Sequence, residues 1–144
     1  MSANFFNNFP QSIFEPFTIT SPTTVRYNCI AWAFEDDSKW YWPDDTKLYY
    51  WPPTVPRELT VEAFKKLYAL KNYIVCADGS YEKGFEKIAI FSNNNIPTHA
   101  ARQIGENLWT SKLGKHEDVS HSLTAMQNGC YGNVAVFMKR KTKT

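Results

Sequence analysis

The second half of the chain, from residue 73 onward, is a series of short apolar runs separated by turn-forming residues. These runs are rich in β-branched and aromatic side chains, and they lie at residues 73–76, 87–91, 98–104, 108–113 and 133–138. Runs of this length predict strands, and the short connections between them favour antiparallel pairing. A short helix is expected at 119–127, ahead of Gly129.

The first half of the chain instead predicts two helices. Asn28 can cap a helix over residues 29–35, because its side-chain oxygen can accept an amide proton from the first turn. Thr60 can cap a second helix, in which apolar residues recur at helical spacing as far as Asn72. Two helices followed by strands predict an α+β domain, in which N-terminal helices pack on one face of an antiparallel sheet.

A chain of 144 residues is long enough for one compact domain. We divide it into an extended N-terminal arm (residues 1–25), a single α+β domain (26–140) and a basic tail (141–144). The arm is expected to pack its phenylalanines on the rest of the protein, namely Phe5, Phe6, Phe14 and Phe17.

The charge of the chain is nearly balanced, at +2, and its one cluster of cations is the C-terminal tail, so nucleic acid is not expected as a partner. No apolar stretch approaches the length of a membrane span, and the first residues lack the features of a Sec signal peptide. A cytoplasmic location is expected, with export by a route that reads no Sec signal as the alternative. The sequence does not indicate an oligomeric state.

The three cysteines, an odd number, do not have the pattern of a disulfide framework. Cys29 follows Asn28 and therefore lies in the first turn of the predicted helix. The helix macrodipole and the free amide groups of that turn favour the thiolate, which is the nucleophilic form. The alternative is that Cys29 is a small buried apolar residue, as many free cysteines are.

A thiol nucleophile needs a histidine base and a polar group that orients the imidazole ring. His99, near the start of a later strand, is the expected base, and the alternative is a buried structural histidine. Ser111, Asn107 and His121 are available to orient the ring, and His121 is preferred because it can both accept and donate. Cys29 and the two histidines could instead bind zinc, but short-range ligand pairs such as CxxC are absent. Neither a metal nor another cofactor is therefore expected.

Aromatic side chains gather between residues 39 and 57, where several prolines predict a structured loop rather than a helix or a strand. The rings of this loop can form a platform for a ligand. The residues expected to bind substrate are Trp40, Trp42, Trp51, Arg102 and Trp109. The alternative is that the loop forms a lid or a small satellite core against the first helix.

Several segments resemble an uncharacterised bacterial domain family. They are Tyr27-Asn28-Cys29-Ile30-Ala31-Trp32-Ala33, Trp40-Tyr41-Trp42-Pro43, Lys87-Ile88-Ala89-Ile90, Thr98-His99-Ala100-Ala101-Arg102-Gln103 and Trp109-Thr110-Ser111-Lys112-Leu113-Gly114. The resemblance extends over about residues 25–140, and it implies no function by itself.

More loosely, the chain is similar to the papain-like superfamily in its NlpC/P60 and CHAP forms, although the Asp-Cys-Ser-Gly type of motif is missing. The similarity implies a papain-like core in which Cys29 is the nucleophile, His99 is the base and Tyr27 helps to bind the oxyanion. It implies a thiol-dependent hydrolase, which is an amidase, a peptidase or an acyltransferase acting on a peptide or protein. The alternative is a non-catalytic module that presents the aromatic loop to a peptide, a glycan or a protein partner.

Overall fold

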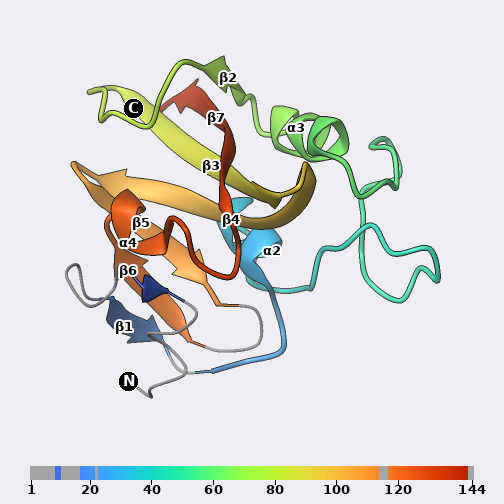
Figure 1. The fold of residues 1–144 in the computed structure, drawn as a ribbon. Coiled ribbons are helices and arrows are strands. Elements are labelled where there is room, and N and C mark those ends of the chain that lie inside the picture. The colour runs from blue at the N-terminus through green and yellow to red at the C-terminus, as the bar shows by residue number, and fades with distance from the viewer. Residues whose placement is uncertain (1–8, 11–16, 22, 114–116, 143–144) are drawn as a thin grey trace.

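The structure, a computed structural model, describes residues 9–10, 17–21, 23–113 and 117–142. In these residues the main element is a seven-stranded antiparallel sheet with the strand order β1-β6-β5-β4-β3-β7-β2 (Figure 1). The strands are β1 (Thr18–Ser21), β2 (Ile74–Cys76), β3 (Phe85–Asn93), β4 (Ile96–Gly105), β5 (Leu108–Lys112), β6 (Asp118–His121) and β7 (Asn133–Lys141). β3 to β6 are neighbours in the chain and in the sheet, as the short connections predict.

Three short helices accompany the sheet in the described residues: α2 (Cys29–Ala33), α3 (Val61–Ala69) and α4 (Leu123–Met126). Both predicted N-caps are confirmed. The side chain of Asn28 accepts from the Ala31 amide at 3.2 Å, and that of Thr60 accepts from the Ala63 amide at 3.1 Å. α2 ends before residue 35, where Glu35 takes a left-handed conformation with φ of 66°.

The predicted α+β domain with N-terminal helices on a sheet, and the papain-like core with it, are wrong. The described residues are mostly antiparallel sheet, and α2, α3 and α4 have only 5, 9 and 4 residues. Part of the arm is the edge strand β1, which pairs with β6. β6 itself replaces the first residues of the helix predicted at 119–127, because it pairs with β5 on its other side. Strands of four residues are too short to show a periodic pattern of their own, and pairing with neighbouring strands stabilises them.

The apolar core has two parts, one on each face of the sheet. Side chains alternate between the faces along a strand. The helix-side cluster joins α2 and α3 to Ile88, Ile90, Ala100 and Met138. The opposite cluster joins α4 to Ala89, Phe91, Ala101 and Trp109. Phe17 of the predicted arm is buried in the opposite cluster, whereas Phe5, Phe6 and Phe14 lie outside the described residues.

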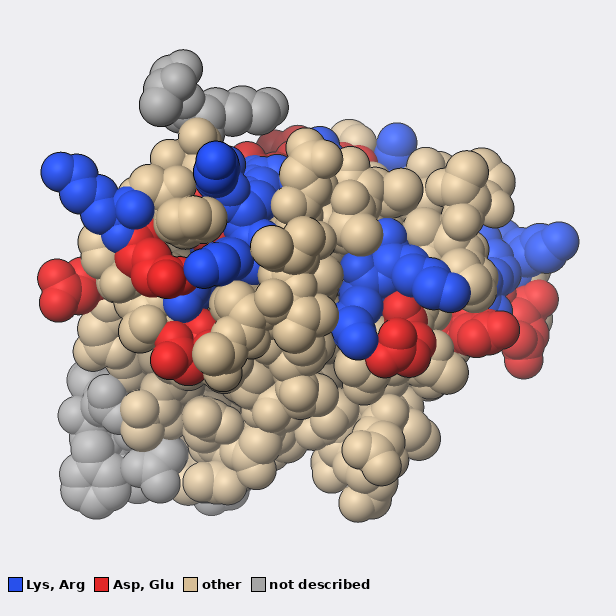
Figure 2. All heavy atoms as spheres, turned by 90° about the horizontal axis from the view of Figure 1, so that it is seen from above, with Lys and Arg blue, Asp and Glu red and all other residues tan. Residues whose placement is uncertain are grey.

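The surface has charges of both signs. On the face seen in Figure 2, basic and acidic side chains lie interleaved rather than in one continuous basic area. Within the part of the chain that the structure describes, no helix has the length and apolar character to span a bilayer.

Candidate functional site

Cys29 lies at the start of α2, as predicted, but it is buried in the helix-side cluster with an exposed fraction of 5%. Burial raises the pKa of its thiol to about 11, and hydrogen bonding to the amides of Ala100 and Ile30 offsets only part of this rise. The shift is opposite in direction to the one expected from a helix N-terminus. Desolvation outweighs the dipole of a helix of 5 residues, so the thiol is protonated at neutral pH.

The His99 ring packs in the opposite cluster, not in the helix-side cluster that holds Cys29. Ala100, the next residue along β4, lies in the same cluster as Cys29, so His99 points to the other face of the sheet. Its ring stacks on Tyr131 with the centroids 4.2 Å apart, and it meets the edge of Phe91 in the opposite cluster. The thiol and the imidazole thus belong to different clusters, and among the described residues no hydrogen bond joins them.

The structure does bring together His99, Ser111 and His121. Nδ1 of His121 lies 2.7 Å from the Ser122 carbonyl and can only donate to it, so Nε2 of the neutral ring is an acceptor. The Ser111 hydroxyl donates to this Nε2 at 2.7 Å and accepts from Nε2–H of His99 at 3.0 Å. These contacts fix the direction of the whole hydrogen-bond chain.

This histidine–serine network is sealed from solvent. His99 and Ser111 have no exposed surface, and the Phe17 ring stacks on His121. Burial lowers the pKa of His121 to about 4 and holds the pKa of His99 well below its ordinary value. Both rings are therefore neutral at pH 7, and the network connects β4, β5 and β6 inside the core.

Tyr27 belongs to a separate polar cluster on the helix side. Its hydroxyl donates to the Asp118 carboxylate at 2.5 Å, and burial together with this carboxylate raises the pKa of Tyr27 to about 12. Lys112, which faces Asp118 across β5 and β6, is also fully buried and donates to the Thr24 carbonyl at 2.8 Å. The sequence analysis did not single out Lys112 or Asp118. A charged residue within an apolar strand was the available signal for Lys112.

The loop over residues 39–57, called the aromatic loop below, is held by its own polar contacts. The Asp44 carboxylate accepts from the Thr46 hydroxyl and from the amides of Leu48 and Tyr49, and its pKa is lowered to about 2. The Arg57 guanidinium bridges the loop by donating to the carbonyls of Asp44 and Tyr49. The loop is therefore ordered although it contains no helix or named strand.

The rings of the aromatic loop divide into an inner and an outer group. Trp42 and Trp51 pack against Phe64 of α3, with centroid distances of 5.8 and 5.3 Å, and Trp51 is buried. The outer group is Leu48, Tyr49 and Tyr50, which are 75%, 38% and 41% exposed. Trp40 is half-buried, and the centroid of its ring lies 5.7 Å from that of Tyr49. The inner group is a satellite core, and the outer group faces solvent.

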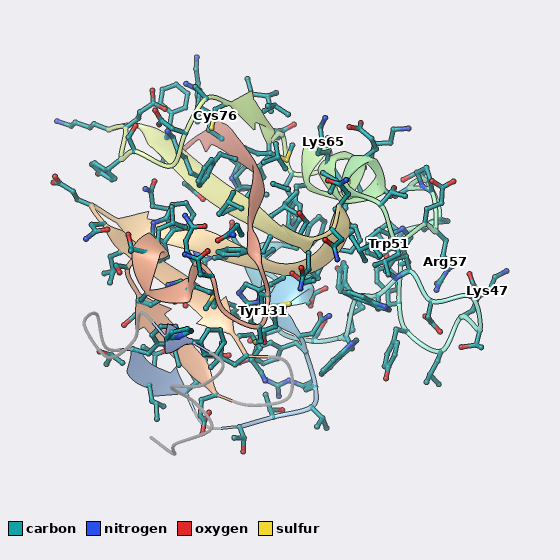
Figure 3. All side chains as sticks on the ribbon, in the orientation of Figure 1. Lys47, Trp51, Arg57, Lys65, Cys76 and Tyr131 are labelled. Atoms are coloured by element: carbon teal, nitrogen blue, oxygen red, sulfur yellow. The ribbon has the colours of Figure 1, made fainter. Side chains whose placement is uncertain are left out.

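A pocket of about 500 Å³ lies at the second half of the loop, between Lys47 and the stretch from Trp51 to Arg57. Figure 3 shows Lys47, Trp51 and Arg57 together on this side of the molecule, beyond the end of the sheet. The other two residues expected to bind substrate lie elsewhere. Trp109 is buried in the opposite cluster, and the guanidinium of Arg102 lies 5.7 Å from the centre of the Trp32 ring.

The described residues contain no group of three or more His, Cys, Asp and Glu side chains with the arrangement of a metal site.

Comparison with known proteins places the chain in a family. Residues 18–139 match the family described as Domain of unknown function (DUF7689), and the chain belongs to it. Searches of curated proteins and of solved structures give no match.

Proposed function

We propose that this member of the family is a binding module, and that its aromatic loop presents Leu48, Tyr49 and Tyr50 to a peptide segment of a partner protein. The observation that carries the proposal is the division of the loop into buried anchors and exposed apolar side chains. Tyrosine is enriched among the hot-spot residues of protein interfaces, and the loop presents Tyr49 and Tyr50 on a rigid support. A loop that is already ordered loses little conformational entropy when it binds.

The geometry supports this function better than the thiol-dependent hydrolase. Among the described residues no hydrogen bond joins Cys29 to His99, and burial raises the pKa of the thiol instead of lowering it. The His99, Ser111 and His121 side chains do contact one another, but they have almost no exposed surface for a substrate to reach.

A peptide fits the loop better than a glycan does. A sugar platform needs a flat indole face open to solvent, whereas Trp42 and Trp51 use their rings to pack against Phe64. The exposed groups are instead a leucine and two tyrosines, with the ammonium of Lys39 4.7 Å from the centre of the Tyr50 ring. A peptide with apolar side chains and a nearby acidic residue matches this combination.

The test is selection from a random phage-displayed peptide library, followed by calorimetric titration of the enriched peptides. The double variant Leu48→Ser/Tyr50→Ser is expected to bind them at least about tenfold more weakly than the unsubstituted protein. Val75→Ser is the matched control, because Val75 is an exposed apolar residue of β2. Failure of any peptide to enrich, or equal affinity of the double variant, would overturn the proposal.

A further inference from the structure

The sheet splits open between β3 and β4. Their pairing ends at Ile88 and Arg102; beyond that point residues 85–87 pair with β7 and residues 103–105 pair with β5. The two strands diverge toward this end of the sheet (Figure 1). A pocket of about 340 Å³ lies in the split and is lined from both strands, by Phe85 and Glu86 on one side and by residues 102–105 on the other. Its volume is at the lower end of the range for small-molecule sites.

Two polar atoms in the lining of this pocket are buried without a hydrogen-bond partner among the described residues. They are Nε of Arg102 and Oε1 of Gln103. Gln103 is only 6% exposed, and its amide nitrogen already donates to the Gly79 carbonyl at 2.9 Å. Gln103 pairs with Trp109 of the opposite cluster, whereas Arg102 lies over Trp32 of α2, so the two atoms are on opposite faces of β4. Because nearly all buried polar groups in proteins have partners, the free Nε of Arg102 points to a ligand that supplies an acceptor.

The charges around the pocket have both signs. Across the described residues, Arg102 makes no ion pair. Its guanidinium lies over the face of the Trp32 ring. Glu35 and Glu86 also line the pocket, and both contact the same nitrogen, Nη2, of Arg140. One guanidinium is therefore available to an anion, beside two carboxylates that share a single protein cation.

We propose that this split binds a free α-amino acid with an apolar side chain. The ligand carboxylate accepts from Nε and a terminal nitrogen of Arg102, in the side-by-side geometry typical of arginine and carboxylate. The ligand ammonium donates to the carboxylate of Glu86, which lines the pocket on the same face as Arg102. Its side chain packs against the exposed Ile104. No residue of the aromatic loop lines this pocket, so the inference is independent of the proposed function.

The experiment is calorimetric titration of the full chain with free leucine and free phenylalanine. At least one is expected to bind, and Arg102→Gln is expected to weaken that binding at least about tenfold, as loss of a charged hydrogen bond does. Lys66→Gln removes one positive charge from the exposed side of α3 and is the matched control, with unchanged affinity expected.

Analogues of the ligand separate its two charged ends. The methyl ester removes the carboxylate charge, and the N-acetyl derivative removes the ammonium charge, so each is expected to bind much more weakly than the free amino acid. Because these analogues are titrated into the unsubstituted protein, the test stands even if Arg102→Gln fails to fold. Absence of binding at millimolar concentration, or equal binding of either analogue, would overturn the proposal.

Discussion

Acidification from pH 7.5 to pH 5 is expected to destabilise the protein through the two buried histidines. In the unfolded chain a histidine has a pKa near 6.5, whereas in the folded protein burial lowers the pKa of His121 to about 4. Between these values the unfolded state binds a proton that the folded state does not bind. The free energy of unfolding therefore falls as the pH falls through this window, and it is restored above pH 6.5.

The size of the effect follows from the same two pKa values. Integrating the difference in proton binding gives a loss of about 2 kcal/mol at pH 5 for His121 alone. His99 adds a loss of the same sign, because burial also lowers its pKa. Asp44, whose pKa is lowered to about 2, contributes stability that is lost only at lower pH. A domain of this size is typically stable by about 5–15 kcal/mol, so the loss is easily measured.

Urea denaturation followed by tryptophan fluorescence measures this loss at the two pH values. In the variant His121→Gln the side-chain oxygen can still accept from Ser111, but the residue no longer titrates. The difference between the two pH values should therefore shrink by about 2 kcal/mol in this variant. Equal stability of the unsubstituted protein at pH 7.5 and pH 5 would refute the neutral, buried network.

Three further predictions concern the thiol, the network and the loop. Iodoacetamide at neutral pH should label exposed Cys130 well before Cys29, because Cys29 is buried and its thiol has a pKa of about 11. Mass spectrometry of peptides gives the order of labelling, and early labelling of Cys29 would reveal an accessible thiolate. Ser111→Ala should lower the free energy of unfolding by about 2–4 kcal/mol, because two buried imidazole nitrogens lose their partner. The control Ser38→Ala, at an exposed position, should lower it by less than about 1 kcal/mol. Similar losses for the two variants in urea denaturation would contradict the network. Asp44→Ala should weaken the binding of library-selected peptides several-fold by releasing the amides of the aromatic loop, and an unchanged affinity in calorimetry would argue against a pre-organised loop.

The local signals of the sequence predicted the central part of the fold. The apolar runs at 87–91, 98–104, 108–113 and 133–138 correspond to β3, β4, β5 and β7, and the capping residues Asn28 and Thr60 begin helices. These features arise from neighbouring residues, so a linear pattern contains them. β1 and β6 were not predicted, because each is only four residues long and β1 depends on pairing with β6 about a hundred residues later.

The candidate site depended on a distinction that spacing could not supply. A shift of one residue along a strand moves a side chain to the other face of the sheet. β4 has His99 on one face and Ala100 on the other. Ala100 and Ala101 lie on opposite faces, and each is small enough to lie under a helix. The sequence placed His99 and Ser111 on neighbouring strands, whereas His121, expected in the helix over 119–127, lies on β6. It could not tell which face α2 covers.

The measurement that tests the binding-module account most directly is a nuclear magnetic resonance titration of isotope-labelled protein with a library-selected peptide. The account predicts that the backbone amides of Leu48, Tyr49 and Tyr50 shift, and that Cys29→Ala binds the peptide with unchanged affinity. Shifts centred on Cys29 with the aromatic loop unaffected, together with loss of binding in Cys29→Ala, would contradict it.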